Sequence, residues 1–161
     1  MTDYRRRKIP GATYFFTIVA QDRQPILNEA HARFCLKQAI RHVQSYRPFR
    51  VEAIVLLPEH IHTIWSLPDG DFDFSGRWNW IKRKFTQKYS QSGCYPTPIS
   101  LSKKKKRVCG IWQRRFWEHC IQDDTDFIRH LDYIHYNPVK HGLVAHPREW
   151  LWSTFHRYVR L

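Results

Sequence analysis

Two strand-like segments separated by only two residues limit the fold more than any other part of this sequence. Residues 51–57 and 60–67 are rich in β-branched and aromatic side chains, a composition typical of strands. Pro58 and Glu59 form the only link between them. A link this short favours an antiparallel hairpin. We therefore expect an antiparallel sheet built around this hairpin.

The rest of the chain alternates between strand-like and helical patterns. Beside the hairpin, strands are predicted at 13–19 and 116–121, and helices at 28–46, 75–89 and 123–137. Pro138 is expected to end the last helix, because the residue before a proline is pushed out of the helical region. The order β-α-β-β-α-β-α fits an α+β fold, the ferredoxin-like αβ plait, an antiparallel sheet with helices on one face. The other face is then free to meet a ligand.

The chain is strongly basic. Its 161 residues carry 27 Lys and Arg against 14 Asp and Glu, a formal net charge of +13. A small globular domain of this charge points to a polyanion, most often nucleic acid. Aromatic residues make up 16% of the chain, and aromatic side chains beside basic ones suit the stacking of unpaired bases. A bulky core would also use aromatics, so the charge is the stronger signal.

A single domain is predicted over residues 1–161, because this length suits one compact core. Three segments differ in composition: a basic arm at 1–10, a basic loop at 90–110 and an aromatic C-terminal tail at 145–161. The four cysteines form no CxxC pair, so no zinc site is indicated. A disulfide framework is not expected either, because the sequence opens with polar and basic residues and no apolar segment follows them. The sequence also has no signal-peptide pattern and no apolar run long enough to span a bilayer. These features predict a cytoplasmic protein with no membrane partner.

His60 and His62 are the most pointed candidates for chemistry. Residues two apart on a strand share a face, so both imidazoles should project the same way, while Ile61 turns into the opposite layer. Two imidazoles this close can bind one divalent metal and leave positions open for phosphate or water. The alternative is two strand histidines that alternate by chance, since an isolated His-x-His is common.

Tyr133 and Asn137 form a second candidate pair near the end of the last helix. Their spacing of four residues places the phenol and the carboxamide on one side of the helix. Phe127, Leu131 and Ile134 form the apolar stripe, so Tyr133 need not belong to the core. The alternatives are a helix-terminating role for Asn137 and a surface aromatic at Tyr133.

Four motifs occur in order along the chain. They are PEHIH at 58–62, IWQRRFWEH at 111–119, YIHYNPVKHGLV at 133–144 and WSTFHRY at 152–158. Together they resemble the REP-associated tyrosine transposases, a branch of the single-tyrosine HUH transposases, where HUH denotes His-hydrophobic-His. The resemblance covers nearly the whole chain, and four ordered motifs are far more specific than the His pair alone.

The resemblance implies a role for each candidate residue. His60 and His62 match the metal ligands of the HUH motif, and Tyr133 matches the nucleophile. Asn137 matches the polar residue that completes metal binding one helical turn later, where related insertion-sequence transposases carry Gln. The metal expected for the family is Mg or Mn, although a site with two imidazoles does not by itself select Mg.

The resemblance also implies nicking and rejoining of single-stranded DNA at REP-type hairpins through a 5′-phosphotyrosine, by a monomer or homodimer at the bacterial nucleoid. DNA contacts are expected from the basic arm, the second helix, the basic loop and the second motif. The candidates are Arg5, Arg6, Arg7, Lys8, Lys82, Arg83, Lys88, Lys103, Lys104, Lys105, Lys106, Arg107, Arg114 and Arg115. A solvated basic face is the alternative for each cluster taken singly.

Two other functions compete with this one. The first is a non-catalytic module that binds single-stranded nucleic acid on the same plait, with aromatic residues stacking bases. The second is a metal-dependent nuclease that uses activated water and never links to DNA. The presence of both His residues and the tyrosine in one chain favours the transposase, since a binding module does not need them.

Overall fold

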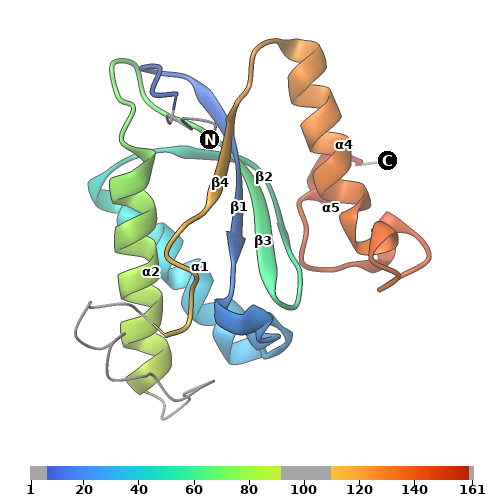
Figure 1. The fold of residues 1–161 in the computed structure, drawn as a ribbon. Helices are drawn as coiled ribbons and strands as arrows, with labels where there is room; N and C mark the ends of the chain where they lie inside the picture. The colour runs from blue at the N-terminus through green and yellow to red at the C-terminus, as the bar shows by residue number, and fades with distance from the viewer. Residues whose placement is uncertain (1–6, 92–109, 160–161) are drawn as a thin grey trace, which may run out of the picture.

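The computed structural model describes residues 7–91 and 110–159, and its centre is a four-stranded antiparallel sheet (Figure 1). The strands are β1 (Thr13–Val19), β2 (Arg50–Leu56), β3 (His60–Ser66) and β4 (Trp117–Cys120), in the spatial order β2-β3-β1-β4. β2 and β3 form the predicted hairpin, closed by a hydrogen bond of 2.9 Å from the Leu57 N–H to the His60 carbonyl. The α+β class and the antiparallel sheet are confirmed.

Two long helices cover one face of the sheet (Figure 1). They are α1 (Ala30–Tyr46) and α2 (Phe74–Gln91). Tyr14, Phe16 and Ile18 alternate along β1 and point into this layer, where all three are buried. The Trp65 ring on β3 stacks on the Trp78 ring of α2 with centroids 4.3 Å apart. Large aromatic rings are thus a major part of the main core, with nine among its 23 buried residues.

The third long helix, α4 (Asp124–Lys140), lies against the opposite face of the sheet (Figure 1). Its Ile134 packs in a second apolar cluster with Phe15 of β1 and Val55 of β2. The expectation that all helices share one face, with the other left free, is therefore wrong in this respect. The physical reason is that β1 is apolar on both faces, and an apolar second face needs a covering element.

The end of α4 also differs from the prediction. Pro138 does not end the helix, which continues to Lys140. Pro138 has no N–H to bond the carbonyl four residues earlier, so one bond of the ladder is lost, but the helix runs only two residues beyond it. The first helix begins at Ala30, because residues 26–28 form a separate 3-10 turn, η2 (Ile26–Asn28). A similar turn, η1 (Gln21–Arg23), precedes it.

The C-terminal segment packs along the outer edge of β2. It contains η3 (Pro147–Glu149) and the short α5 (Phe155–Tyr158). The Leu56 N–H donates to the Trp152 carbonyl and the Thr154 N–H donates to the Ile54 carbonyl, both at 2.9 Å. Trp150 Nε1 also donates to the Leu56 carbonyl at 2.9 Å. Within residues 7–91 and 110–159, no helix has the length and apolar character needed to cross a bilayer.

Candidate active site

His60 and His62 lie on the sheet face that α4 covers, and both are buried. Their Nε2 atoms are 3.1 Å apart. His60 Nδ1 is 2.8 Å from a carboxylate oxygen of Glu59, and His62 Nδ1 is 2.9 Å from Thr17 Oγ1. With Nδ1 protonated and donating to these oxygens, each imidazole keeps its Nε2 lone pair for a ligand. The predicted sharing of one face is confirmed.

Burial keeps both imidazoles neutral. Burial first, and then the neighbouring His60, His141 and Lys140, together lower the pKa of His62 to about 3. Burial also lowers the pKa of His60, against the opposing effect of the Glu59 carboxylate. Only the neutral imidazole binds a metal ion, so this environment favours the ligating form of both side chains.

Three polar residues at intervals of four face the histidine pair: Tyr133 and Asn137 of α4, and His141 at the C-terminal cap of that helix. The Tyr133 ring lies edge-on to the His62 ring at 5.2 Å, and the His141 ring lies edge-on to the His60 ring at 5.5 Å. Asn137 stands on the same side of the helix, one turn from each of them. We call Tyr133, Asn137 and His141 the α4 stripe. It runs alongside both histidines, and the Asn137 carboxamide stands between the Tyr133 contact and the His141 contact.

Asn137 is 1% exposed, and neither its Oδ1 nor its Nδ2 has a hydrogen-bond partner among the described residues. A buried amide is almost always hydrogen-bonded, because burying it without a partner is costly. A cation held by two imidazole nitrogens and the amide oxygen would satisfy that oxygen. The residues present thus fit the divalent metal that the sequence motifs imply.

Tyr133 combines access with a positive neighbour. Its side chain is 38% exposed, so the phenol can be reached from solvent. The ring rests edge-on against Phe15 at 5.9 Å, and Lys140 Nζ lies 5.0 Å from the ring centroid. The phenol is therefore anchored on one side and open on another, as a nucleophile that attacks an external substrate must be.

Four residues of this site were not identified from the sequence: Thr17, Glu59, Lys140 and His141. Glu59 lies within the PEHIH motif, and His141 continues the spacing of four from Tyr133 and Asn137. Both signals were present in the sequence. Thr17 gave no local signal, since only the pairing of β1 with β3 places it opposite His62.

A second group of possible metal ligands lies between β4 and α4. His119 Nε2 is 2.8 Å from one carboxylate oxygen of Asp126, and His130 Nδ1 is 3.1 Å from the other. The two imidazoles stack with centroids 4.6 Å apart, and the donor atoms of all three residues lie within 4.8 Å of one another. Such a group could hold a metal ion. It was not predicted, because the three residues come from two different elements.

The structure shows which of the predicted DNA-binding residues lie on the surface. Arg83, Lys88, Arg114 and Arg115 are exposed, as are Arg7 and Lys8 of the arm. Lys82 is buried, and its Nζ donates to the Gln113 carbonyl at 3.0 Å, so the prediction that it lies on the surface is wrong. Its position facing the chain at 113–116 explains this burial. Arg5, Arg6, Lys103, Lys104, Lys105, Lys106 and Arg107 lie outside the described residues.

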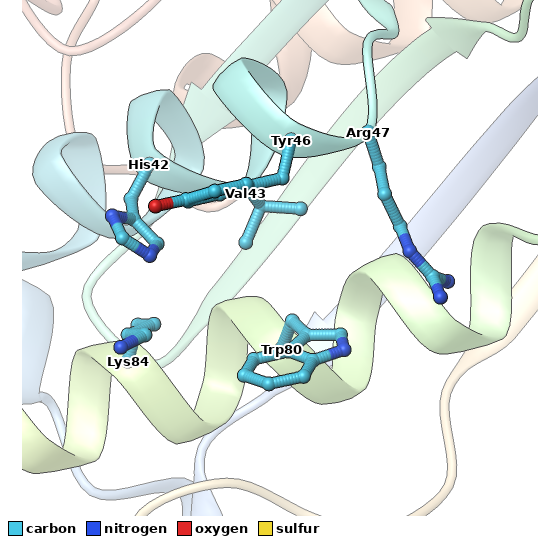
Figure 2. Close-up of a pocket in the computed structure, with 6 residues that line it drawn as sticks. All are labelled: His42, Val43, Tyr46, Arg47, Trp80 and Lys84. Carbon is cyan, nitrogen blue, oxygen red and sulfur yellow. The ribbon is translucent and has the colours of Figure 1, made fainter.

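A cavity of about 410 Å³ lies between α1 and α2, on the other side of the sheet (Figure 2). Figure 2 shows His42 pointing from α1 toward Lys84 of α2, while the Tyr46 ring lies along α1 beside His42. None of the residues lining this cavity belongs to the histidine and tyrosine site. The histidine and tyrosine site thus lies only on the sheet face that α4 covers.

Comparisons with known proteins agree with this geometry. No family model matches the chain. It is 44% identical over 162 residues to the REP-associated tyrosine transposase of Escherichia coli strain K12, covering 99% of this chain and 86% of that protein. A Haemophilus influenzae relative is 43% identical over 161 residues, 99% of this chain and 89% of its own.

Among solved structures, the chain is similar to a REP-associated tyrosine transposase bound to a REP hairpin. The TM-score is 0.79 at 43% identity, over 98% of this chain and 84% of that one. Close similarity in sequence and in fold thus extends across almost the full length. The chain belongs to the REP-associated tyrosine transposases.

Proposed function

We propose that this chain cleaves and rejoins single-stranded DNA at REP-type hairpins, with Tyr133 as the nucleophile. One observation carries the proposal: the exposed phenol of Tyr133 lies edge-on to buried His62, one helical turn from the Asn137 amide, which has no partner within residues 7–91 and 110–159. A non-catalytic binding module would have no reason to bury two neutral imidazoles and an amide beside an accessible phenol.

The proposed step is an exchange of phosphodiester bonds. The Tyr133 oxygen attacks the phosphorus of a DNA phosphodiester and loses its proton, and the bond to the 3′ oxygen breaks. The products are a 5′-phosphotyrosine and a DNA end with a free 3′-OH, which takes up a proton. Because the bond energy is kept in the protein–DNA link, another 3′-OH can attack it and rejoin the strands.

His60, His62 and Asn137 would hold the divalent ion, Mg or Mn. Such an ion supplies charge neutralisation at the phosphate oxygens as the attack proceeds. Glu59 and Thr17 fix the two imidazoles so that both Nε2 atoms face the same point. Lys140, beside the Tyr133 ring, adds a positive charge where the phosphate would approach.

The proposed DNA substrate determines what we expect of the surface contacts, the oligomeric state and the location of the protein. Arg7, Lys8, Arg83, Lys88, Arg114 and Arg115 are candidate phosphate contacts on the described surface. Arg5, Arg6 and the run at 103–107 remain predictions, as does the choice between monomer and homodimer. Action on chromosomal hairpins would place the protein in the bacterial cytoplasm, at the nucleoid.

The direct test is a covalent adduct. Purified protein is incubated with a REP hairpin from the same genome and Mn²⁺ or Mg²⁺, then run on a denaturing gel. We expect a protein–DNA adduct that disappears in Tyr133→Phe, while hairpin affinity changes by less than about two-fold, since the variant loses one oxygen from a half-exposed ring.

Each alternative predicts a different result. Cleavage without an adduct, persisting in Tyr133→Phe, would assign the reaction to activated water. Tight binding with neither adduct nor cleavage would assign the chain to the binding modules. A matched control is Tyr136→Phe, which removes the same oxygen from an exposed tyrosine of the same helix and should leave the adduct intact.

A further inference from the structure

A large groove lies at the outer edge of β2, away from the histidine and tyrosine site. It has a volume of about 730 Å³ and is bordered by α1, β2 and the C-terminal segment. We call it the basic groove, because its lining includes Arg33, Lys37, Arg41, Arg50 and Arg157 and not one acidic residue. None of these five cations was among the candidates taken from the sequence.

Three cations of the basic groove form a regular row on α1, and two of these three are exposed. Arg33, Lys37 and Arg41 recur every four residues along α1, so they form one row with a rise of about 6 Å between neighbours. Lys37 and Arg41 are exposed, and no carboxylate among the described residues pairs with either of them. Arg50 is different, since its Nε bonds to Glu52 at 2.6 Å.

Two aromatic side chains stand in the same groove. Phe34 is 56% exposed and Trp152 is 36% exposed. The Arg33 guanidinium lies over the Trp152 ring at 4.0 Å, and its Nη1 donates to the Leu27 carbonyl at 2.8 Å and the Asn28 carbonyl at 2.9 Å. These bonds hold Arg33 in place, so the groove presents a fixed stack of cation and indole.

We propose that the basic groove binds an unpaired stretch of the DNA substrate, with α1 cations on its phosphates and Phe34 and Trp152 against its bases. Charge complementarity selects a polyanion. The exposed aromatics select a single strand over a duplex, because bases within a duplex are already stacked on one another. This proposal rests on the proposed function, since it assigns the same DNA a second contact.

The cavity between α1 and α2 is a weaker candidate for this role. It is smaller, about 410 Å³ against about 730 Å³. Of its cations, Arg47 is already paired with Asp73 at 2.6 Å. The basic groove also borders residues 152–154, and Thr154 Oγ1 there lies 2.9 Å from His135 Nε2 of α4. A strand held in the groove is thus joined through one contact to the helix that carries Tyr133.

The test measures the affinity of the full chain for a fluorescent, unstructured oligonucleotide over a range of salt concentrations. The variant Lys37→Gln with Arg41→Gln removes two groove charges. The control, Lys84→Gln with Arg148→Gln, removes the same charge from outside the groove. If both groove cations contact phosphates, the slope of log K against log salt falls in magnitude by about 1.4, while the control slope stays unchanged.

A second variant tests the stacking. Trp152→Leu keeps an apolar side chain and removes the aromatic face, and we expect a loss of about ten-fold in affinity for the oligonucleotide. A duplex of the same sequence should bind this variant as it binds the unaltered chain. Circular dichroism on each variant confirms that the fold is retained.

The outcomes separate this proposal from the proposed function. Groove variants that bind the oligonucleotide like the unaltered chain, while the adduct still forms, would overturn the groove alone. Equal losses for duplex and single strand in Trp152→Leu would also overturn it. Failure of the unaltered chain to bind any DNA would instead overturn the proposed function.

Discussion

The buried side chain of Asn137 lowers the stability of the folded protein, and it serves the site instead. It is 1% exposed, and its two polar atoms have no partner among the described residues. An unsatisfied buried amide costs about 1–3 kcal/mol. Such a cost is commonly found where function, not folding, requires the residue. The amide is thus a place where stability and activity should respond to substitution in opposite directions.

We expect Asn137→Leu to raise the free energy of unfolding of the metal-free protein by about 1 kcal/mol, because a side chain of similar size replaces an unpaired amide. The same variant should lose most of the increase in Tm that Mn²⁺ gives the unaltered chain. Urea unfolding in chelator and thermal unfolding in Mn²⁺ measure the two effects. A metal-free variant less stable than the unaltered chain would show that the amide has a partner.

Helix α4 is held at both ends of its sheet-facing stripe by polar contacts. Asp126, near its start, receives hydrogen bonds from the Gln122 N–H and bonds to His119 of β4. Farther along, His135 bonds to Thr154 Oγ1, which also accepts from the Ile54 N–H of β2. The element that carries Tyr133 is thus tied to both edges of the sheet.

The His135 contact makes this attachment sensitive to acid. Burial lowers the pKa of His135 to about 4, from an ordinary value of 6.5. Between these values the unfolded chain is protonated at this residue and the folded chain is not, so the free energy of unfolding falls as pH falls. The full loss for this one group is on the order of 3 kcal/mol.

We expect His135→Gln to flatten the pH dependence of stability between about pH 6.5 and pH 4, because glutamine can keep the contact to Thr154 without titrating. Urea unfolding midpoints across this range, compared with the unaltered chain, measure the difference. The control is His31→Gln, at an exposed position on α1. Identical slopes for the His135 variant and the unaltered chain would contradict the prediction.

Local pattern predicted the elements well, and their placement less well. The hairpin, the pairing of His60 with His62 and the spacing of Tyr133 and Asn137 all follow from periodicities within one element. The placement of α4 depends on which face of the sheet is still uncovered, which no single segment encodes. Arg77 shows the same limit: it is 1% exposed, and its partners include the distant carbonyl of Pro48.

Across the whole molecule, the two faces of the sheet have different tasks. The α1 and α2 face holds most of the buried aromatic rings, including Phe16 against Trp65 and Trp78. The α4 face has a smaller apolar cluster and all the residues proposed for chemistry. Stability should therefore depend mainly on the first face, and activity mainly on the second.

We expect Phe16→Ala to lower the free energy of unfolding by about 3–5 kcal/mol, and Tm by about 10 °C, because it leaves a cavity among packed rings. At a temperature where the variant is folded, its adduct yield should match that of the unaltered chain. His62→Ala should show the reverse, with little change in Tm and no adduct. Calorimetry and the denaturing gel measure the two. A large loss of adduct in folded Phe16→Ala would contradict this division.

The strip of C-terminal chain along β2 has a consequence for how copies of this protein meet. An uncovered edge strand offers free N–H and carbonyl groups on which a second molecule can add its own strand, the usual start of edge-to-edge aggregation. Here the protein's own residues 152–154 occupy the N–H of Leu56 and the carbonyl of Ile54. These residues therefore block strand addition at this edge. Two copies could form one continuous sheet across this part of β2 only if residues 152–154 first detached from it.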